Sequence, residues 1–258
     1  MREVLRKHLA PGEQLPELPP ALPMIAIPRF ELSESAPLDS RLPKPAQVGP
    51  PVSMEELNQD YGLVLYRHHP ARAAKGTLAI GEVRDFAVVR GTTLDARLRQ
   101  TSMEVELRPD EPLDILVEAM GRINFGPRLK DVRKGIVGKI ALDGEELRDW
   151  EHYPLPVADP GRWPFARKPA AAPALYRGTF RLDATGDTFL DMRGWGKGLV
   201  WINGHNLGRY WRVGPQQSLF LPAPWLRAGE NEAIVLDLLA GGRRTLESRT
   251  ERVYETPA

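Results

Sequence analysis

Short apolar or alternating runs, each ended by glycine, proline or aspartate, fill most of this sequence after residue 60. A first block contains YGLVLYRHH, GTLAIG, DFAVVRG, MEVELRP and LDILVEA, and a second contains ALYRGTFRLD, DTFLDM, LVWING, QSLFLP and AIVLDLL. Runs this short, bounded by turn-forming residues, are typical of β-strands and leave little room for long helices. The sequence therefore predicts an all-β fold built in two blocks.

Proline precedes the blocks and separates them. The segment EHYPLPVADPGRWPFARKPAAAPA between the blocks contains six prolines, and residues 11–51 are similarly rich in them. Proline at this density excludes long helices and central strands. We expect an extended connector over residues 11–51, with one edge strand near 24–32; a proline-rich ligand for another domain is the alternative. A short amphipathic helix in MREVLRKHL is expected before it, and a helical turn with a Ser53–Glu56 capping box after it.

The two blocks also resemble each other. The segment FAVVRGTTLDARLR, residues 86–99, aligns without gaps on LVWINGHNLGRYWR, residues 199–212. Further on, DEPLDILVEA is parallel to GENEAIVLDL with a small change in length. Each unit has the pattern of a strand, a tight glycine turn, a second strand, a loop and a last apolar strand. This repetition predicts two β-sandwiches of one type rather than one large sheet.

Charge and composition exclude several classes of function. The net charge is +1, and no concentrated basic face of the kind that binds nucleic acid is present. No apolar run is long enough to span a bilayer. The chain has no cysteine, its five histidines lack metal-ligand spacing, and no phosphate-loop or dinucleotide motif occurs. We therefore expect no metal, no other cofactor, and neither a nucleic-acid nor a membrane partner.

The segment GWGKGLVWINGHNLGRYW, residues 194–211, concentrates aromatic and amide side chains. Sugars present apolar faces that stack on aromatic rings and hydroxyls that bind polar groups, so one interpretation is a sugar-binding platform. The other is a buried strand pair, because alternate side chains of residues 199–202 point to opposite faces and at least one face must be core. Asn203-Gly204 predicts a tight hairpin turn, and tryptophan is usually buried. These arguments favour the core interpretation.

The same segment, continued to VGPQQSLFLPAPWLRAGENEAIVLDL, closely resembles the C-terminal β-domain of glycoside hydrolase family 35 β-galactosidases. The segments MEELNQDYGLVLYR and VEAMGRINFGPRLKDVRKGIVGKIALDG resemble the preceding β-domain, and LRKHLAPGEQLPELPPALP the connector that leaves the catalytic barrel. The resemblance implies two jelly-roll β-sandwiches that are galactose-binding-domain-like. It divides the chain into a barrel-helix remnant and connector (1–52), a first sandwich (53–157), a linker (158–172) and a second sandwich (173–258).

In the family, both catalytic glutamates of the retaining reaction lie in a (β/α)8 barrel that precedes these domains. No position of this sequence matches them, so no catalytic residue is assigned. The resemblance implies a substrate contact at Asn124 and Phe125, although Phe125 departs from the tyrosine often found there. It also implies barrel contacts at Arg122, Arg128 and Lys134. The sugar-platform interpretation adds substrate contacts at Trp195, Asn203, His205 and Trp211.

The resulting expectation is a non-catalytic part of a β-galactosidase-like glycoside hydrolase that supports a barrel and is inactive alone. Its expected partner is a barrel polypeptide or a preceding catalytic domain, with galactosides as a further ligand. The alternative is a free-standing carbohydrate-binding module that recognises galactosides. The N-terminal residues lack the apolar core of a signal peptide, which with the absence of cysteine favours the cytoplasm.

Overall fold

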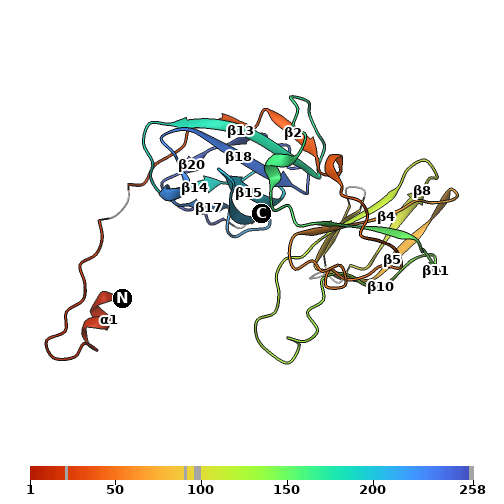
Figure 1. Cartoon of the computed structure of the whole chain (residues 1–258), viewed down its shortest axis with the longest axis horizontal. Helices are drawn as coiled ribbons and strands as arrows, with labels where there is room; N and C mark the ends of the chain where they lie inside the picture. The colour runs from red at the N-terminus through yellow and green to blue at the C-terminus, as the bar shows by residue number, and fades with distance from the viewer. Residues whose placement is uncertain (21–22, 90–91, 96–99, 256–258) are drawn as a thin grey trace.

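The structure is a computed structural model that describes residues 1–20, 23–89, 92–95 and 100–255. Four β-sheet layers, stacked in two pairs, make up the body of the protein (Figure 1). The expected all-β fold with two sandwiches is confirmed. The longest α-helix of the described residues, α1 (Arg2–Arg6), has five residues. No helix within those ranges is long and apolar enough to cross a membrane.

The first sandwich pairs a four-stranded sheet with a six-stranded sheet. The four-stranded sheet has the order β11-β10-β5-β8, with strands Glu145–Glu146, Gly135–Leu142, Ala74–Arg84 and Ser102–Leu107. The six-stranded sheet has the order β3-β12-β4-β9-β6-β7, with strands Gln47–Gly49, Trp150–Leu155, Leu63–His68, Leu113–Glu118, Phe86–Val89 and Thr92–Asp95. All their pairings are antiparallel.

The second sandwich has the same kind of construction. Its five-stranded sheet has the order β16-β15-β18-β13-β2, with strands His205–Trp211, Lys197–Ile202, Gly229–Asp237, Ala174–Leu182 and Glu34–Pro37. It faces the three-stranded sheet β17-β14-β20, formed by Ser218–Leu221, Thr188–Asp191 and Ser248–Arg249. The short pair β1 (Phe30–Glu31) and β19 (Thr245–Leu246) completes it.

The predicted repeat is visible in the strand order. The edge hairpin β7-β6 continues to β9 and β4, and the edge hairpin β16-β15 continues to β18 and β13 in the same sequence. The two apolar segments that the sequence pairs, 110–119 and 229–238, supply β9 and β18. Gly91 and Arg99, which the alignment matches with Gly204 and Arg212, lie outside the described residues.

The proline-rich segment is more than a connector. Its residues form β2, which pairs with β13 at an edge of the second sandwich, and β3, which pairs with β12 at an edge of the first. Both are edge strands, the one sheet position that tolerates nearby prolines. Ile27 and Leu32 are buried in the core of the second sandwich. The first sandwich is therefore inserted between two segments of the second.

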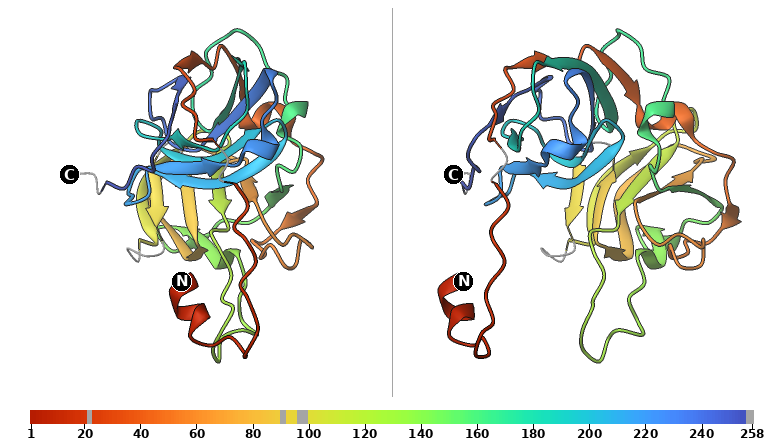
Figure 2. Two further views of the ribbon diagram at one scale, coloured as in Figure 1. Left: turned by 90° about the vertical axis from the view of Figure 1, so that its left-hand side faces the viewer. Right: turned by 60° about the vertical axis from the view of Figure 1, so that its left-hand side comes forward.

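A third apolar core joins the two sandwiches, whose larger sheets pack against each other (Figure 2). Along β4, Val64 and Tyr66 point into the first sandwich, while Leu63 and Leu65 point into this shared core. Trp201 and Leu236 enter it from the second sandwich. Both large sheets are thus covered on both faces, so the two sandwiches form one body.

The capping box is also confirmed. The Ser53 backbone N–H donates to Glu56 Oε2 at 2.9 Å, and the Glu56 backbone N–H donates to Ser53 Oγ at 3.4 Å. A run of turns follows in place of a regular helix.

Candidate functional site

The aromatic segment 194–211 forms the edge hairpin of β15 and β16. Asn203 and Gly204 have φ values of 51° and 82°, which is the conformation of the predicted hairpin turn. The Asn203 amide donates to Trp225 O and to Asn231 Oδ1, both at 2.8 Å, and its Oδ1 accepts the Glu232 N–H at 3.0 Å. The Asn203 side chain therefore holds the turn against the neighbouring strands.

The tryptophans of segment 194–211 point in different directions. Trp195 is 1% exposed in the core of the second sandwich, where its Nε1 donates to Thr245 O at 3.2 Å. Trp201 lies in the core between the sandwiches. Trp211 is half-buried and meets Phe86 of the first sandwich edge to face, with 5.3 Å between ring centroids.

His205 is exposed and stacks on Trp225, with ring centroids 4.9 Å apart. The residues expected to form a sugar platform thus occupy two cores, an interdomain contact and an exposed turn. They do not line one surface.

A charged cluster lies between the sandwiches beside the shared core. Glu118 ends β9 of the first sandwich, and its two carboxylate oxygens accept hydrogen bonds from Lys197 Nζ and, at 2.6 Å, from Arg209 Nε of the second. Arg209 Nη2 also donates to Ala119 O at 3.2 Å. We call Glu118, Lys197 and Arg209 the junction triad.

Two members of the junction triad are deeply buried, Lys197 and Glu118, whereas the Arg209 side chain is 30% exposed. The Lys197 side chain is 0% exposed, and its ammonium lies 4.7 Å from the ring centre of Phe86 and 4.6 Å from that of Trp211. Cation–π contacts and the carboxylate compensate part of the cost of removing this charge from water. Burial also lowers the pKa of Arg209, although a guanidinium stays charged. Removing Glu118 would leave two cations without their carboxylate, whereas removing Lys197 would leave the buried Glu118 with Arg209 as its remaining partner.

The sequence contained one sign of this cluster. Lys197 begins a strand whose two faces are both apolar, so a buried lysine there requires an acidic partner. Glu118 and Arg209 were not predicted as site residues, because nothing local places them opposite Lys197.

The loop between β9 and β10 carries the other predicted contacts, and it projects from the first sandwich (Figure 1). Asn124 and Phe125 are exposed, the latter by 87%. Arg128 is exposed and lines a cavity of about 410 Å³ at the base of the loop. Arg122, which is exposed, and Lys134 make contacts within the first sandwich and its loop. Arg122 Nη1 donates to Val132 O at 2.8 Å, and the buried Lys134 ammonium pairs with Asp85 at 2.7 Å.

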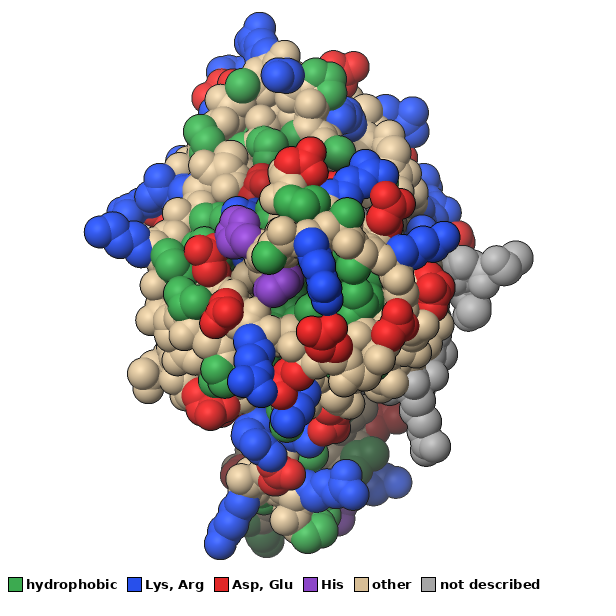
Figure 3. Space-filling model, turned by 90° about the vertical axis from the view of Figure 1, so that its right-hand side faces the viewer, with side chains coloured by type: hydrophobic (Ala, Val, Ile, Leu, Met, Phe, Trp, Pro, Cys, Tyr) green, Lys and Arg blue, Asp and Glu red, His purple; other side chains and the backbone are tan. Residues whose placement is uncertain are grey.

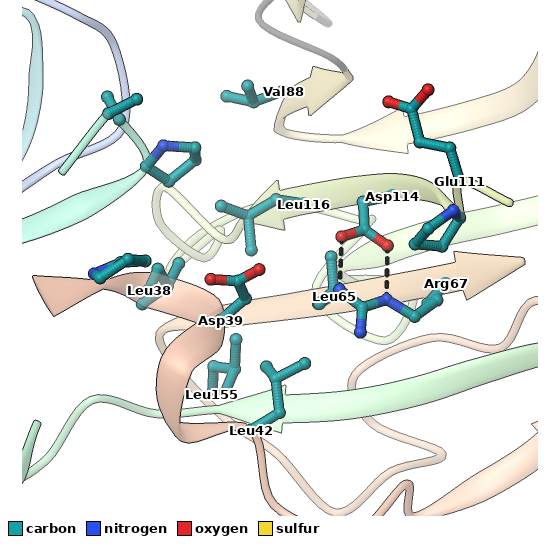
Figure 4. Close-up of a pocket in the computed structure, with 15 residues that line it drawn as sticks. Leu38, Asp39, Leu42, Leu65, Arg67, Val88, Glu111, Asp114, Leu116 and Leu155 are labelled. Carbon is teal, nitrogen blue, oxygen red and sulfur yellow. Dashed lines mark hydrogen bonds and ion pairs between the residues drawn. The ribbon is translucent and has the colours of Figure 1, made fainter. Parts of the chain in front are cut away.

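A cavity of about 440 Å³ opens at the far end of β4, between the sandwiches (Figure 4). Its leucine-rich floor continues the shared core. Arg67 and Asp114 lie on it as a bidentate pair, with Nε–Oδ1 and Nη2–Oδ2 distances both 2.7 Å. The carboxylate of Asp39 points toward that pair. The charges of Arg67 and Asp114 neutralise each other in this pair. We therefore interpret the cavity as the edge of the contact between the two sandwiches and not as a binding site.

Outside these sites the surface is mixed. Figure 3 shows acidic and basic side chains interspersed over the face of the first sandwich that is turned away from the second. Within the described ranges, no three His, Asp or Glu side chains are grouped so as to hold a metal ion.

Comparison with known proteins agrees with this architecture. The family profile described as "Beta-galactosidase, first all-beta domain" matches residues 51–156, and that described as "Beta-galactosidase, galactose-binding domain" matches residues 173–231. The first match covers the first sandwich except β3, and the second covers much of the other sandwich, so together they span more than half of the chain.

Several curated relatives extend over most of the chain. A "Beta-galactosidase" of Xanthomonas manihotis is 42% identical over 81% of this chain and 36% of its own length. A "Beta-galactosidase-1-like protein 3" of Mus musculus is 34% identical over 98% of this chain and 42% of its own. A "Beta-galactosidase" of Homo sapiens is 31% identical over 91% and 40%.

The fold and the shared interface define two tandem β-sandwich domains joined into one unit. The chain belongs to the β-galactosidase family, and it carries that family's non-catalytic β-domains. It spans about two fifths of the length of the curated relatives it matches.

Proposed function

We propose that this chain is the supporting part of a β-galactosidase-type enzyme and that it packs against a (β/α)8 barrel bearing the catalytic carboxylates. The relatives' names and the share of their length that the chain spans support this proposal. In it, the parent enzyme releases terminal β-linked galactose by the retaining reaction, and this chain supplies no reacting group.

The observation that carries the proposal is the exposed apolar side chains of the β9–β10 loop. Ile123, Phe125 and Leu129 are 44%, 87% and 50% exposed on a segment that projects from the body. Exposed apolar side chains gathered on one segment are typical of a contact with another protein surface. Arg128 and Lys130 on the same loop are also exposed, so the facing barrel surface is expected to be apolar with acidic residues around it.

The base of the loop is ordered by the body of the first sandwich. Arg122 donates to Asp60 O at 3.1 Å and 3.0 Å, and Glu55 Oε2 accepts the Lys134 N–H at 2.9 Å. An anchored loop presents its tip with little loss of conformational entropy on docking. Asn124 and Phe125, at this tip, are the residues we propose to lie nearest to the barrel and its substrate, and Arg128 contacts the barrel directly.

Co-expression tests the proposal. The barrel segment of the Xanthomonas manihotis relative is expressed with this chain, and complex formation and hydrolysis of a chromogenic β-galactoside are measured. We expect the chain alone to be inactive, the pair to co-purify, and the pair to hydrolyse the substrate faster than the barrel alone.

A matched pair of variants locates the contact. Phe125→Asp is expected to abolish co-purification, whereas Phe220→Asp, which alters a 49%-exposed phenylalanine on β17, leaves it intact. Hydrolysis by the chain alone, or equal loss in both variants, contradicts the proposal.

A further inference from the structure

A separate cavity of about 320 Å³ opens where the two sandwiches meet, next to the junction triad. The first sandwich supplies Asp60 and Tyr61 to its lining, and the second supplies Asn206 and Arg209. We propose that this junction cavity binds a neutral saccharide unit, the pyranose ring of a monosaccharide or of a glycan end. The site differs from the tryptophan platform considered from the sequence, and it does not depend on docking to a barrel.

The lining has an apolar wall and an aromatic rim. Leu63, Pro156 and Leu199 contribute apolar surface from both sandwiches, and the Tyr61 side chain is 52% exposed. A volume of this size lies at the lower end of small-molecule sites, which are apolar with a few placed polar groups. A pyranose ring presents an apolar C–H face, which an exposed phenol ring and an aliphatic wall can cover.

Arg209 gives the cavity a fixed donor. Its Nε and Nη2 are held by Glu118 Oε1 at 2.6 Å and Ala119 O at 3.2 Å. Its Nη1 has no hydrogen-bond partner in the part of the chain that the structure describes. Glu118 and the Ala119 carbonyl therefore fix the orientation of the guanidinium, and its Nη1 group stays available to donate to a ligand. A donor held in this way needs little reorganisation on binding.

Asp60 and Asn206 add an acceptor and a further donor to the lining of the same cavity. The Asp60 backbone carbonyl binds Arg122, and among the described residues its carboxylate has no hydrogen-bond partner. Asn206 Oδ1 accepts the Gly208 N–H at 2.7 Å, which leaves its NH₂ group as a further donor. Sugar hydroxyls both donate and accept, so a lining that combines a carboxylate, a guanidinium and an amide matches them.

The charges of the lining select a neutral ligand. Asp60 and Glu118 are acidic and Arg122 and Arg209 are basic, so the ionised side chains around the cavity cancel. Lys197 is fully buried behind Glu118 and is not part of the lining. A site for an anion or a cation would carry an excess of the opposite charge.

Titration followed by amide NMR tests the site in the whole chain without a barrel. The probes are methyl β-D-galactoside, methyl β-D-glucoside and sodium galacturonate. We expect at least one neutral glycoside to give saturable shifts of the lining amides Gly62 and Gly121. Asp60→Asn and Tyr61→Ala are each expected to weaken binding about tenfold or more. The first substitution removes the charged acceptor, and the second removes the aromatic ring.

The control is Tyr254→Ala, which removes a 61%-exposed tyrosine from outside the cavity. Asp60, Tyr61 and Tyr254 are all exposed, so the three variants should fold, as their spectra will show. Absence of saturable shifts, tighter binding of galacturonate, or equal weakening by the control overturns the proposal. Because no barrel takes part, these outcomes are independent of the co-expression test.

Discussion

Replacing Lys197 with methionine should destabilise both sandwiches together. The Lys197 side chain is 0% exposed and the Glu118 side chain is 4% exposed, so the substitution leaves a buried carboxylate beside the shared core with only Arg209 as its partner. Breaking a buried ion pair by removing one partner costs about 3 to 5 kcal/mol. Since Arg209 remains bound to Glu118 at 2.6 Å, we expect a value near the lower limit, about 3 kcal/mol.

The assay is urea unfolding followed by tryptophan fluorescence, because Trp201 and Trp211 lie at the junction. A loss of about 3 kcal/mol corresponds to a decrease in Tm of roughly 6 to 12 °C for a chain of this size. Lys139→Met is the control, since Lys139 is 75% exposed and pairs with Glu146 at 3.2 Å. It should change stability by less than about 0.5 kcal/mol.

A double variant tests whether the cost arises from the buried carboxylate. Glu118→Gln combined with Lys197→Met removes both charges of the pair while keeping an acceptor for Arg209. The double variant should be no less stable than Lys197→Met alone, which is a non-additive result. The reasoning would be refuted if the double variant lost as much stability as the Glu118→Gln and Lys197→Met single variants together. A loss below about 1 kcal/mol for Lys197→Met would refute it as well.

Three further outcomes are expected. Burial lowers the pKa of His68 and His152, so the fold favours their neutral forms; the stability they confer is present above the unfolded pKa of about 6.5 and is lost as the pH falls below it. The free energy of unfolding from urea titrations should therefore be lower at about pH 5 than at about pH 7.5, by up to roughly 1.4 kcal/mol per pH unit for each histidine, and equal values would contradict this. Asn203→Ala should cost about 2 kcal/mol in thermal unfolding, because it loses three hydrogen bonds at a positive φ, whereas the exposed Asn124→Ala should be neutral. Trp195→Ala should cost about 3 to 5 kcal/mol by removing a buried ring, without changing saccharide affinity under conditions where the variant is folded; a selective loss of binding would restore the tryptophan platform.

Local patterns in the sequence were sufficient for the strands and their repetition. The Asn203-Gly204 turn and the alternation in residues 199–202 are properties of neighbouring residues, and both were confirmed. The alternation left open which face of β15 was core, and the structure buries both. One face belongs to the second sandwich and the other to the interface. The alternation of side chains within one strand cannot show whether a buried face packs inside its own sandwich or against the other sandwich.

The strands of the proline-rich segment could not be predicted in the same way. β2 and β3 have three or four residues each and form because β13 and β12 offer them free edges. Short strands have weak intrinsic preference, so tertiary pairing decides them.

The junction cavity was missed for a related reason. Asp60 and Arg209 are far apart in the sequence, and only the packing of one sandwich on the other brings them together. The sequence instead drew attention to the tryptophans of segment 194–211. Trp195 and Trp201 belong to two apolar cores, and Trp211 contacts Phe86 of the first sandwich.

The insertion of the first sandwich into the second has a consequence for the order of synthesis. Residues 34–37 leave the ribosome early, but their pairing partners in β13, residues 174–177, follow only after the whole first sandwich. The central strand β18, which β13 also needs, is made later still. The inserted sandwich can therefore close while the chain is still being made, whereas the outer one waits with an unpaired apolar segment. A fragment starting at residue 173 would lack β2, Ile27 and Leu32, and we expect it to need residues 24–38 added in trans to become stable.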